Sequence, residues 1–109
     1  MRVYVSENHR VRGKVGFEAV LEALAAAGLS GASVFRGIEG YGASRRLSVA
    51  ASPDTIPDLP MLIEIVDDGE KLRAFLPQLD DLLEGGFVTF ERVEIVLYRP
   101  MSDTPKDGD

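Results

Sequence analysis

The order of hydrophobic periodicities along the chain is the feature that most constrains its fold. Apolar and polar residues alternate at about residues 2–6, as in a strand with one buried face. Apolar residues recur every three or four positions at about residues 15–27, as in a helix with one buried stripe. Two further strands, a second helix and a last strand are predicted at about residues 32–38, 59–66, 68–83 and 88–98. The predicted element order is βαββαβ.

This order favours an α+β ferredoxin-like sandwich, in which two helices cover one face of a four-stranded antiparallel sheet. We expect one domain over residues 1–99 and a disordered tail over residues 100–109, which is rich in Pro, Gly and Asp. Pro77 should kink or break the second helix, because proline lacks an amide proton. Asp67 and Glu70 suit a capping box at its start.

The sheet face without helices needs a cover of its own. The strand patterns place aromatic and charged side chains there: Tyr4, Arg36, Glu64, Glu94, Val96 and Tyr98. An exposed patch of this kind often marks an interface between subunits. The sequence therefore predicts an oligomer.

A glycine-rich stretch with paired arginines follows the second predicted strand. Gly37, Gly40 and Gly42 have the spacing GxxGxG, the reverse of the dinucleotide fingerprint, and they lead into a loop instead of a helix. Glycine permits close backbone approach to a ligand, and arginine offers a planar set of donors to an anion. The candidate ligand-binding residues here are Gly37, Gly40, Gly42, Ser44, Arg45 and Arg46. Alternatively, the glycines only permit a bulge or a turn.

Gly85 and Gly86 separate the second helix from the last strand, where glycine commonly caps a helix. In an oligomer this turn could also approach the glycine-rich loop of a neighbour and complete a cleft, so we include both residues among the ligand-binding candidates. His9 is the only histidine, and we expect it to be a solvated loop residue.

Composition restricts the function classes. The net charge of −6 argues against a nucleic-acid partner, because such proteins usually present a basic face. The chain has no cysteine, which excludes thiolate metal sites and cysteine nucleophiles. No catalytic constellation or phosphate loop with lysine is visible, so we expect neither an enzyme nor a cofactor. No apolar run is long enough to span a membrane, and we expect a cytoplasmic protein without membrane insertion.

Four segments resemble the domain of unknown function 190 family, which is related to the nitrogen regulatory protein PII. They are GASVFRGIEGYGAS (residues 31–44), LPMLIEIVD (59–67), FLP (75–77) and EGGFVT (84–89). The resemblance implies a PII-like fold, a homotrimer with its sheets turned toward the threefold axis, and effector clefts between subunits. It also implies a partner-docking loop from Gly37 to about Asp58. PII proteins typically place lysine after the glycine of the second loop, whereas this chain has Phe87.

The resulting hypothesis is a non-enzymatic PII-like regulator. It would sense a small anionic metabolite between subunits, a nucleotide being one candidate, and signal through a mobile loop at residues 39–58. A membrane transporter or channel is one candidate class of protein partner. The alternative is a metal-responsive or structural trimer that resembles the divalent-cation tolerance proteins, with carboxylates and His9 as ligands.

Overall fold

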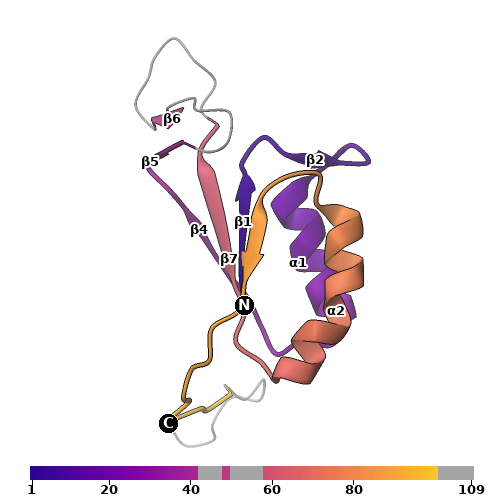
Figure 1. Cartoon of the computed structure of the whole chain (residues 1–109), viewed down its shortest axis with the longest axis vertical. Coiled ribbons are helices and arrows are strands. Elements are labelled where there is room, and N and C mark those ends of the chain that lie inside the picture. Colours follow the sequence, from indigo (N-terminus) through magenta and orange to yellow (C-terminus); the bar gives the residue numbers. More distant parts are fainter. Residues whose placement is uncertain (42–47, 50–57, 101–109) are drawn as a thin grey trace, which may run out of the picture.

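The computed structural model describes residues 1–41, 48–49 and 58–100. Six main elements have the predicted order: β1 (Arg2–Ser6), α1 (Gly16–Ala26), β4 (Ser33–Arg36), β7 (Pro60–Glu64), α2 (Gly69–Leu82) and β8 (Phe87–Thr89). The four strands form one antiparallel sheet in the order β4-β7-β1-β8. Both helices lie on one side of it (Figure 1). The α+β ferredoxin-like prediction is therefore confirmed.

The core lies between the sheet and the helices because every second strand residue points toward them. Val3 and Val5 of β1 are buried beside Met61 and Ile63 of β7. The helices contribute the apolar stripes that the sequence predicts. Their buried apolar side chains include Val20 and Leu24 of α1 and Leu72, Phe75 and Leu79 of α2.

Two short hairpins supplement the sheet. Strands β2 (Arg10–Val11) and β3 (Lys14–Val15) pair with each other through a turn in which Arg12 and Gly13 both have positive φ, 50° and 82°. This combination is typical of a tight hairpin turn. Strands β5 (Glu39–Gly40) and β6 (Ser48–Val49) form the second pair.

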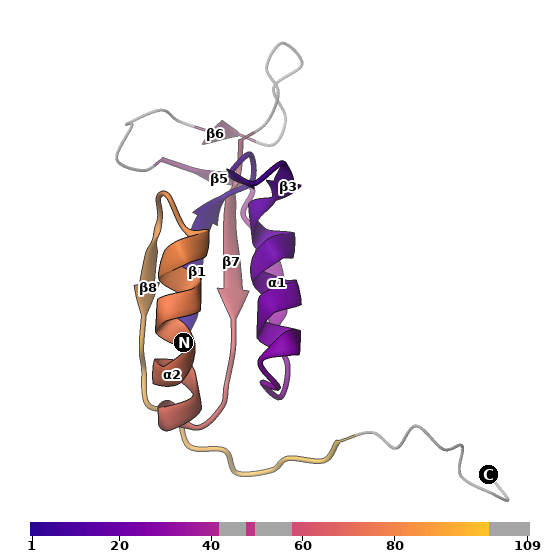
Figure 2. The same ribbon diagram turned by 90° about the vertical axis from the view of Figure 1, so that its right-hand side faces the viewer.

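The last strand is much shorter than the sequence suggests. β8 covers only Phe87–Thr89, and no strand is present in residues 90–100. The reason is the lack of a partner: Thr89 pairs with Arg2, which is already the first residue of β1. Beyond that point the segment leaves the sheet and passes below α2 (Figure 2). The predicted tail begins in this segment, and its residues 101–109 lie outside the described residues.

Helix α2 tests two local predictions. It is one helix from Gly69 to Leu82 with Pro77 inside it, so of the two effects expected of the proline, a kink or a break, the break does not occur. The N-cap residue is Asp68, and its side chain makes no capping hydrogen bond. The predicted capping box is therefore wrong.

The Asp67 carboxylate bonds across the fold instead. It accepts hydrogen bonds from the backbone N–H of Ser30 at 2.8 Å and of Asp68 at 2.7 Å. These two donors, Ser30 first, hold the pKa of Asp67 below its usual value. Asp67 thus links the turn before β4 to the start of α2.

Candidate functional site

The sheet face without helices carries a continuous apolar row. The strand register places Phe35, Leu62, Tyr4 and Phe87 side by side across β4, β7, β1 and β8. The Tyr4 and Phe87 rings stack with their centroids 4.4 Å apart. Phe35 is 52% and Phe87 59% exposed. Because no helix packs on this side, the row forms an apolar surface without a cover within the described residues.

A charged row lies beside it on the same face. Arg2 and Glu64 are cross-strand partners, and their side chains form an ion pair with 3.2 Å between Nε and Oε2. A second ion pair, 3.3 Å long, joins Arg2 to Glu91. The hydrogen bond to Glu64, followed by the charge of Glu91, raises the pKa of the Arg2 guanidinium. Arg2 thus links the carboxylates of Glu64 and Glu91.

Two of the six residues predicted for the uncovered face, Tyr4 and Glu64, occupy it. Glu94, Val96 and Tyr98 lie instead in the segment that leaves the sheet. Arg36 pairs in register with the buried Met61 and therefore has the opposite orientation. The prediction was wrong for these four residues. It assumed a last strand that continues past Thr89, and it assumed that Arg36 points away from the helices.

Gly37 and Gly40 have a visible packing role. The Gly37 N–H donates to the Pro60 carbonyl at 2.8 Å. A Cβ at Gly37 would lie 2.6 Å from Pro60 Cγ, and one at Gly40 would lie 3.1 Å from the same atom. Both glycines therefore permit the chain after β4 to pass close to the start of β7. The other candidates of this stretch, Gly42, Ser44, Arg45 and Arg46, lie outside the described residues, as does most of the loop expected at residues 39–58.

Polar contacts that the sequence analysis missed hold the ends of this stretch. The Glu7 carboxylate accepts two hydrogen bonds from the Arg36 guanidinium, at 3.0 and 3.1 Å, and one from the Leu59 backbone N–H at 3.3 Å. Asp58 accepts from the Ser6 hydroxyl and from the Asn8 N–H at 3.2 Å.

These contacts join the end of β1 to both ends of the interval between β4 and β7. The only sequence signal is that acidic residues border the strands. Their partners are far away along the chain, so spacing alone could not reveal them.

The second glycine pair separates into two roles. Gly86 has a φ of +94°, and a Cβ there would lie only 2.0 Å from the Tyr4 carbonyl oxygen. Nothing lies within 4 Å of a Cβ at Gly85. Gly86 is therefore required by close backbone packing, whereas Gly85 is free of that constraint.

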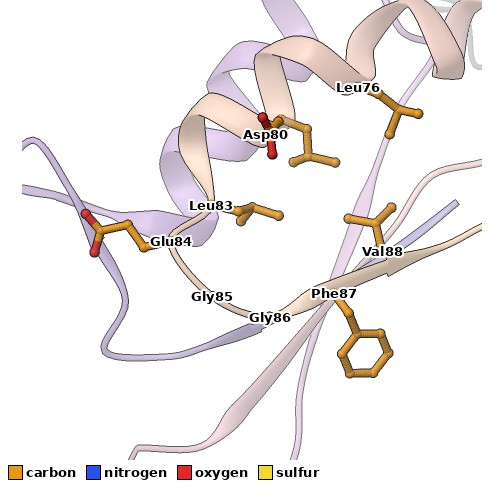
Figure 3. A pocket seen from close by; sticks show the side chains of 9 residues that line it. Leu76, Asp80, Leu83, Glu84, Gly85, Gly86, Phe87 and Val88 are labelled. Atoms are coloured by element: carbon orange, nitrogen blue, oxygen red, sulfur yellow. The ribbon is translucent and has the colours of Figure 1, made fainter. Parts of the chain in front are cut away.

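Both glycines border an open groove of about 380 Å³ between α2 and β8. Leu76, Leu83 and Val88 point into it, and Phe87 points to the opposite side of the strand (Figure 3). Asp80 and Glu84 also line the groove. The groove is thus mainly apolar, with acidic residues at its margin, and it lies beside an edge strand of the sheet.

The two glycine segments lie at the same end of the sheet but at opposite edges. Gly37 follows β4 and Gly86 precedes β8, and these strands are the outer members of the order β4-β7-β1-β8. Three strand spacings separate them, roughly 14 Å. Within the described residues, one chain therefore does not bring Gly37 and Gly86 into a single small pocket.

The N-terminal basic residues are largely paired within the chain. Arg12 contacts Asp81 at 3.0 Å and Lys14 contacts Glu22 at 2.9 Å.

His9 is not merely solvated: its Nε2 lies 3.1 Å from the Leu82 carbonyl oxygen, so it donates to the end of α2. Among residues 1–41, 48–49 and 58–100, no group of three side chains is placed to hold a metal ion.

No helix in the described part of the chain is both long enough and apolar enough to cross a membrane.

Comparison with known proteins places the chain in a family. The DUF190 family model, described as "Uncharacterized ACR", matches residues 1–95. Two UPF0166 proteins of Aquifex aeolicus (strain VF5) are each 33% identical to the chain. One aligns over 96 residues, 88% of this chain and 90% of the relative, and the other over 95 residues, 87% and 93%.

A UPF0166 protein of Methanocaldococcus jannaschii is 31% identical over 91 residues, which cover 77% of each chain. The family match runs from β1 past β8. It thus includes the uncovered sheet face, both glycine segments and the groove. The chain therefore belongs to the DUF190 family.

Proposed function

We propose that this protein is a non-enzymatic, PII-like regulator that assembles as a homotrimer and binds a small anionic metabolite between subunits. Occupancy of the cleft would alter the segment between Glu39 and Asp58 and so change docking of a protein partner. A ligand shifts such an equilibrium only through different affinities for the two states. The four-stranded antiparallel sheet with both helices on one side (Figure 1) supports the fold-level likeness, and the proposal extends it to function.

One observation carries the proposal: the two glycine segments share an end of the sheet but lie at opposite edges. A site that uses both segments needs a second copy, whose β4 edge would approach the β8 edge of the first. The apolar row of Phe35, Leu62, Tyr4 and Phe87 gives the copies a surface to bury. Assembly would thereby create clefts that one chain lacks.

The anionic character of the ligand rests on the sequence. Arg45 and Arg46 follow the glycine-rich stretch directly, and Arg12 and Lys14 already have acidic partners within the chain. Guanidinium groups bind carboxylates and phosphates with paired donors. Phe87 stands where PII proteins typically have lysine, so the phosphate contacts would have to come from the arginines of the first segment.

Assembly can be tested by light scattering coupled to size-exclusion chromatography at micromolar concentration. We expect a trimer for the unmodified chain and a smaller species for Phe35→Glu, because a charge in the apolar row opposes burial. Val66→Glu is the matched control: Val66 is also exposed, at 43%, but lies outside the row. A monomeric unmodified chain would refute the assembly.

Ligand binding can be tested with a panel of nucleotides and inorganic phosphate, by thermal shift followed by calorimetry. We expect at least one anion to stabilise the chain and the Arg45→Ala/Arg46→Ala variant to lose that effect. Arg12→Ala/Lys14→Ala removes the same charge elsewhere and should still bind. Absence of binding by the unmodified chain, or equal binding by both double variants, contradicts the proposed site.

A further inference from the structure

The segment after β8 presents a strand-forming sequence that has no strand partner in the described chain. It contains five exposed hydrophobic residues: Val93 (61%), Ile95 (58%), Val96 (87%), Leu97 (67%) and Tyr98 (66%). β-branched and aromatic residues of this kind favour extended structure that is partly buried. A run of such residues left in water marks an interaction site. We call residues 92–98 the arm.

The arm has one fully apolar face. In an extended chain alternate side chains point to opposite sides, so Val93, Ile95 and Leu97 share one face. The other face carries Arg92 and Glu94 besides Val96 and Tyr98. The arm is therefore suited to pair with a sheet edge while its apolar face enters a groove.

The groove beside β8 has the matching features. Its walls are Leu76, Leu83 and Val88, and β8 is an edge strand with β1 as its only neighbour in the sheet of the described chain. The outer backbone groups of an edge strand can accept a further strand. Asp80 and Glu84 line the groove and form no ion pair within the described residues. Arg99, which follows the arm, has the same alternation as Val93, Ile95 and Leu97 and would face these carboxylates.

The arm cannot readily fill the groove of its own chain. It would have to reverse direction directly after Thr89, and residues 90–98 contain no Gly, Pro, Asn or Asp to form the turn. The start of the segment is also held in place. Phe90 lies under the Arg73 guanidinium, 4.7 Å from its ring centroid, and Glu91 pairs with Arg2.

We propose that the arm of one copy adds as a strand to the β8 edge of a second copy, with Val93, Ile95 and Leu97 in the groove between β8 and α2. The inference rests on the proposed assembly but not on the ligand. It assigns the arm to one surface, the groove, and not to the apolar row on the uncovered sheet face.

Disulfide trapping tests the assignment cleanly, because the natural chain has no cysteine. Ile95→Cys is co-expressed with a differently tagged Leu76→Cys chain, and the oxidised complexes are analysed by non-reducing electrophoresis and mass spectrometry. We expect a disulfide between the two different chains. The matched control replaces Leu76→Cys with Phe35→Cys, which places the thiol in the apolar row.

Three other trapping results would overturn the inference. Trapping with Phe35→Cys alone would place the arm on the uncovered face, and trapping with neither variant would leave the groove unoccupied. A double variant, Ile95→Cys/Leu76→Cys, that closes its disulfide only within one chain at high dilution would mean that the arm folds back. If the chain remains trimeric and binds its anion without the trap, this inference fails and the proposed function stands. If the disulfide forms but the chain binds no anion, the inference about the arm stands and the proposed ligand-binding function fails.

A second measurement avoids cysteine. Ile95→Asp should weaken assembly by at least roughly tenfold, because it places a charge in an apolar groove. Val96→Asp alters the other face and should change assembly by less than about threefold by the same reasoning. Both residues are exposed in the single chain, so neither change should unfold it. Equal effects of the two substitutions would contradict the pairing.

Discussion

Replacing Gly86 by alanine tests how tightly the last turn is bound to the sheet. The residue has a φ of +94°, a conformation that L-residues adopt at a cost of about 1–3 kcal/mol. A Cβ would also lie 2.0 Å from the Tyr4 carbonyl oxygen, a backbone atom of the inner strand β1. The turn must therefore move away from β1.

That movement opposes the pairing of Phe87 and Val88 with Tyr4 and Val3. Losing one or two such hydrogen bonds adds about 1–2 kcal/mol. The total is about 2–5 kcal/mol, a large fraction of the stability of a typical domain. We expect the melting temperature to fall by roughly 10 °C or more.

The assay is urea and thermal unfolding followed by circular dichroism, with Gly85→Ala as the matched control. A methyl group at Gly85 would have no atom within 4 Å, and this residue is not among the glycines with positive φ, so its substitution should change the unfolding free energy by less than about 1 kcal/mol. Equal stability of the two variants would refute the packing role of Gly86. Loss of ligand binding by Gly86→Ala at unchanged stability would mean that its role is ligand contact alone.

Two further substitutions test other parts of the fold. Gly37→Ala should destabilise the chain by about 1–2 kcal/mol, because its Cβ would lie 2.6 Å from Pro60 Cγ; Gly31→Ala, with open space around it, should not, and urea unfolding compares them. Asp67→Asn should lower stability at neutral pH, because the carboxylate accepts from the Ser30 N–H. Since folding lowers the pKa of Asp67, its contribution is present above the unfolded pKa and is lost as the pH falls through the lower folded value. The difference from the unmodified chain should therefore shrink below about pH 4, and a constant difference would show that charge is not involved.

Local patterns were sufficient to predict the element order. The period-two pattern of Val3 and Val5 and the helical stripes of α1 and α2 reflect burial on one face, which each segment records in its own residues. Glycine is common just after the end of a helix, and Gly28, which follows α1, has a φ of +79° and donates to the Ala25 carbonyl. The sequence also singled out Gly37, Gly40, Gly85 and Gly86 as candidate ligand-binding residues. It could not show which of these glycines are required by close packing.

The mistakes arose where the outcome depends on a distant partner. Val93, Ile95 and Leu97 have a strand pattern, but β1 offers no residues to pair with them beyond Arg2. Asp67 resembles a helix cap, but its carboxylate reaches the Ser30 N–H, 37 positions away.

The sequence by itself determined the alternation of strands and helices, the two glycine segments and the absence of thiol chemistry, because these properties belong to single residues or to their near neighbours. Only the tertiary structure decided that the glycine segments lie at opposite edges of one sheet, that Gly86 must pass close to β1, and that Glu7 joins Arg36 to Leu59. These features depend on strand order and register. Pairing between strands far apart in sequence sets both, and no local pattern encodes it.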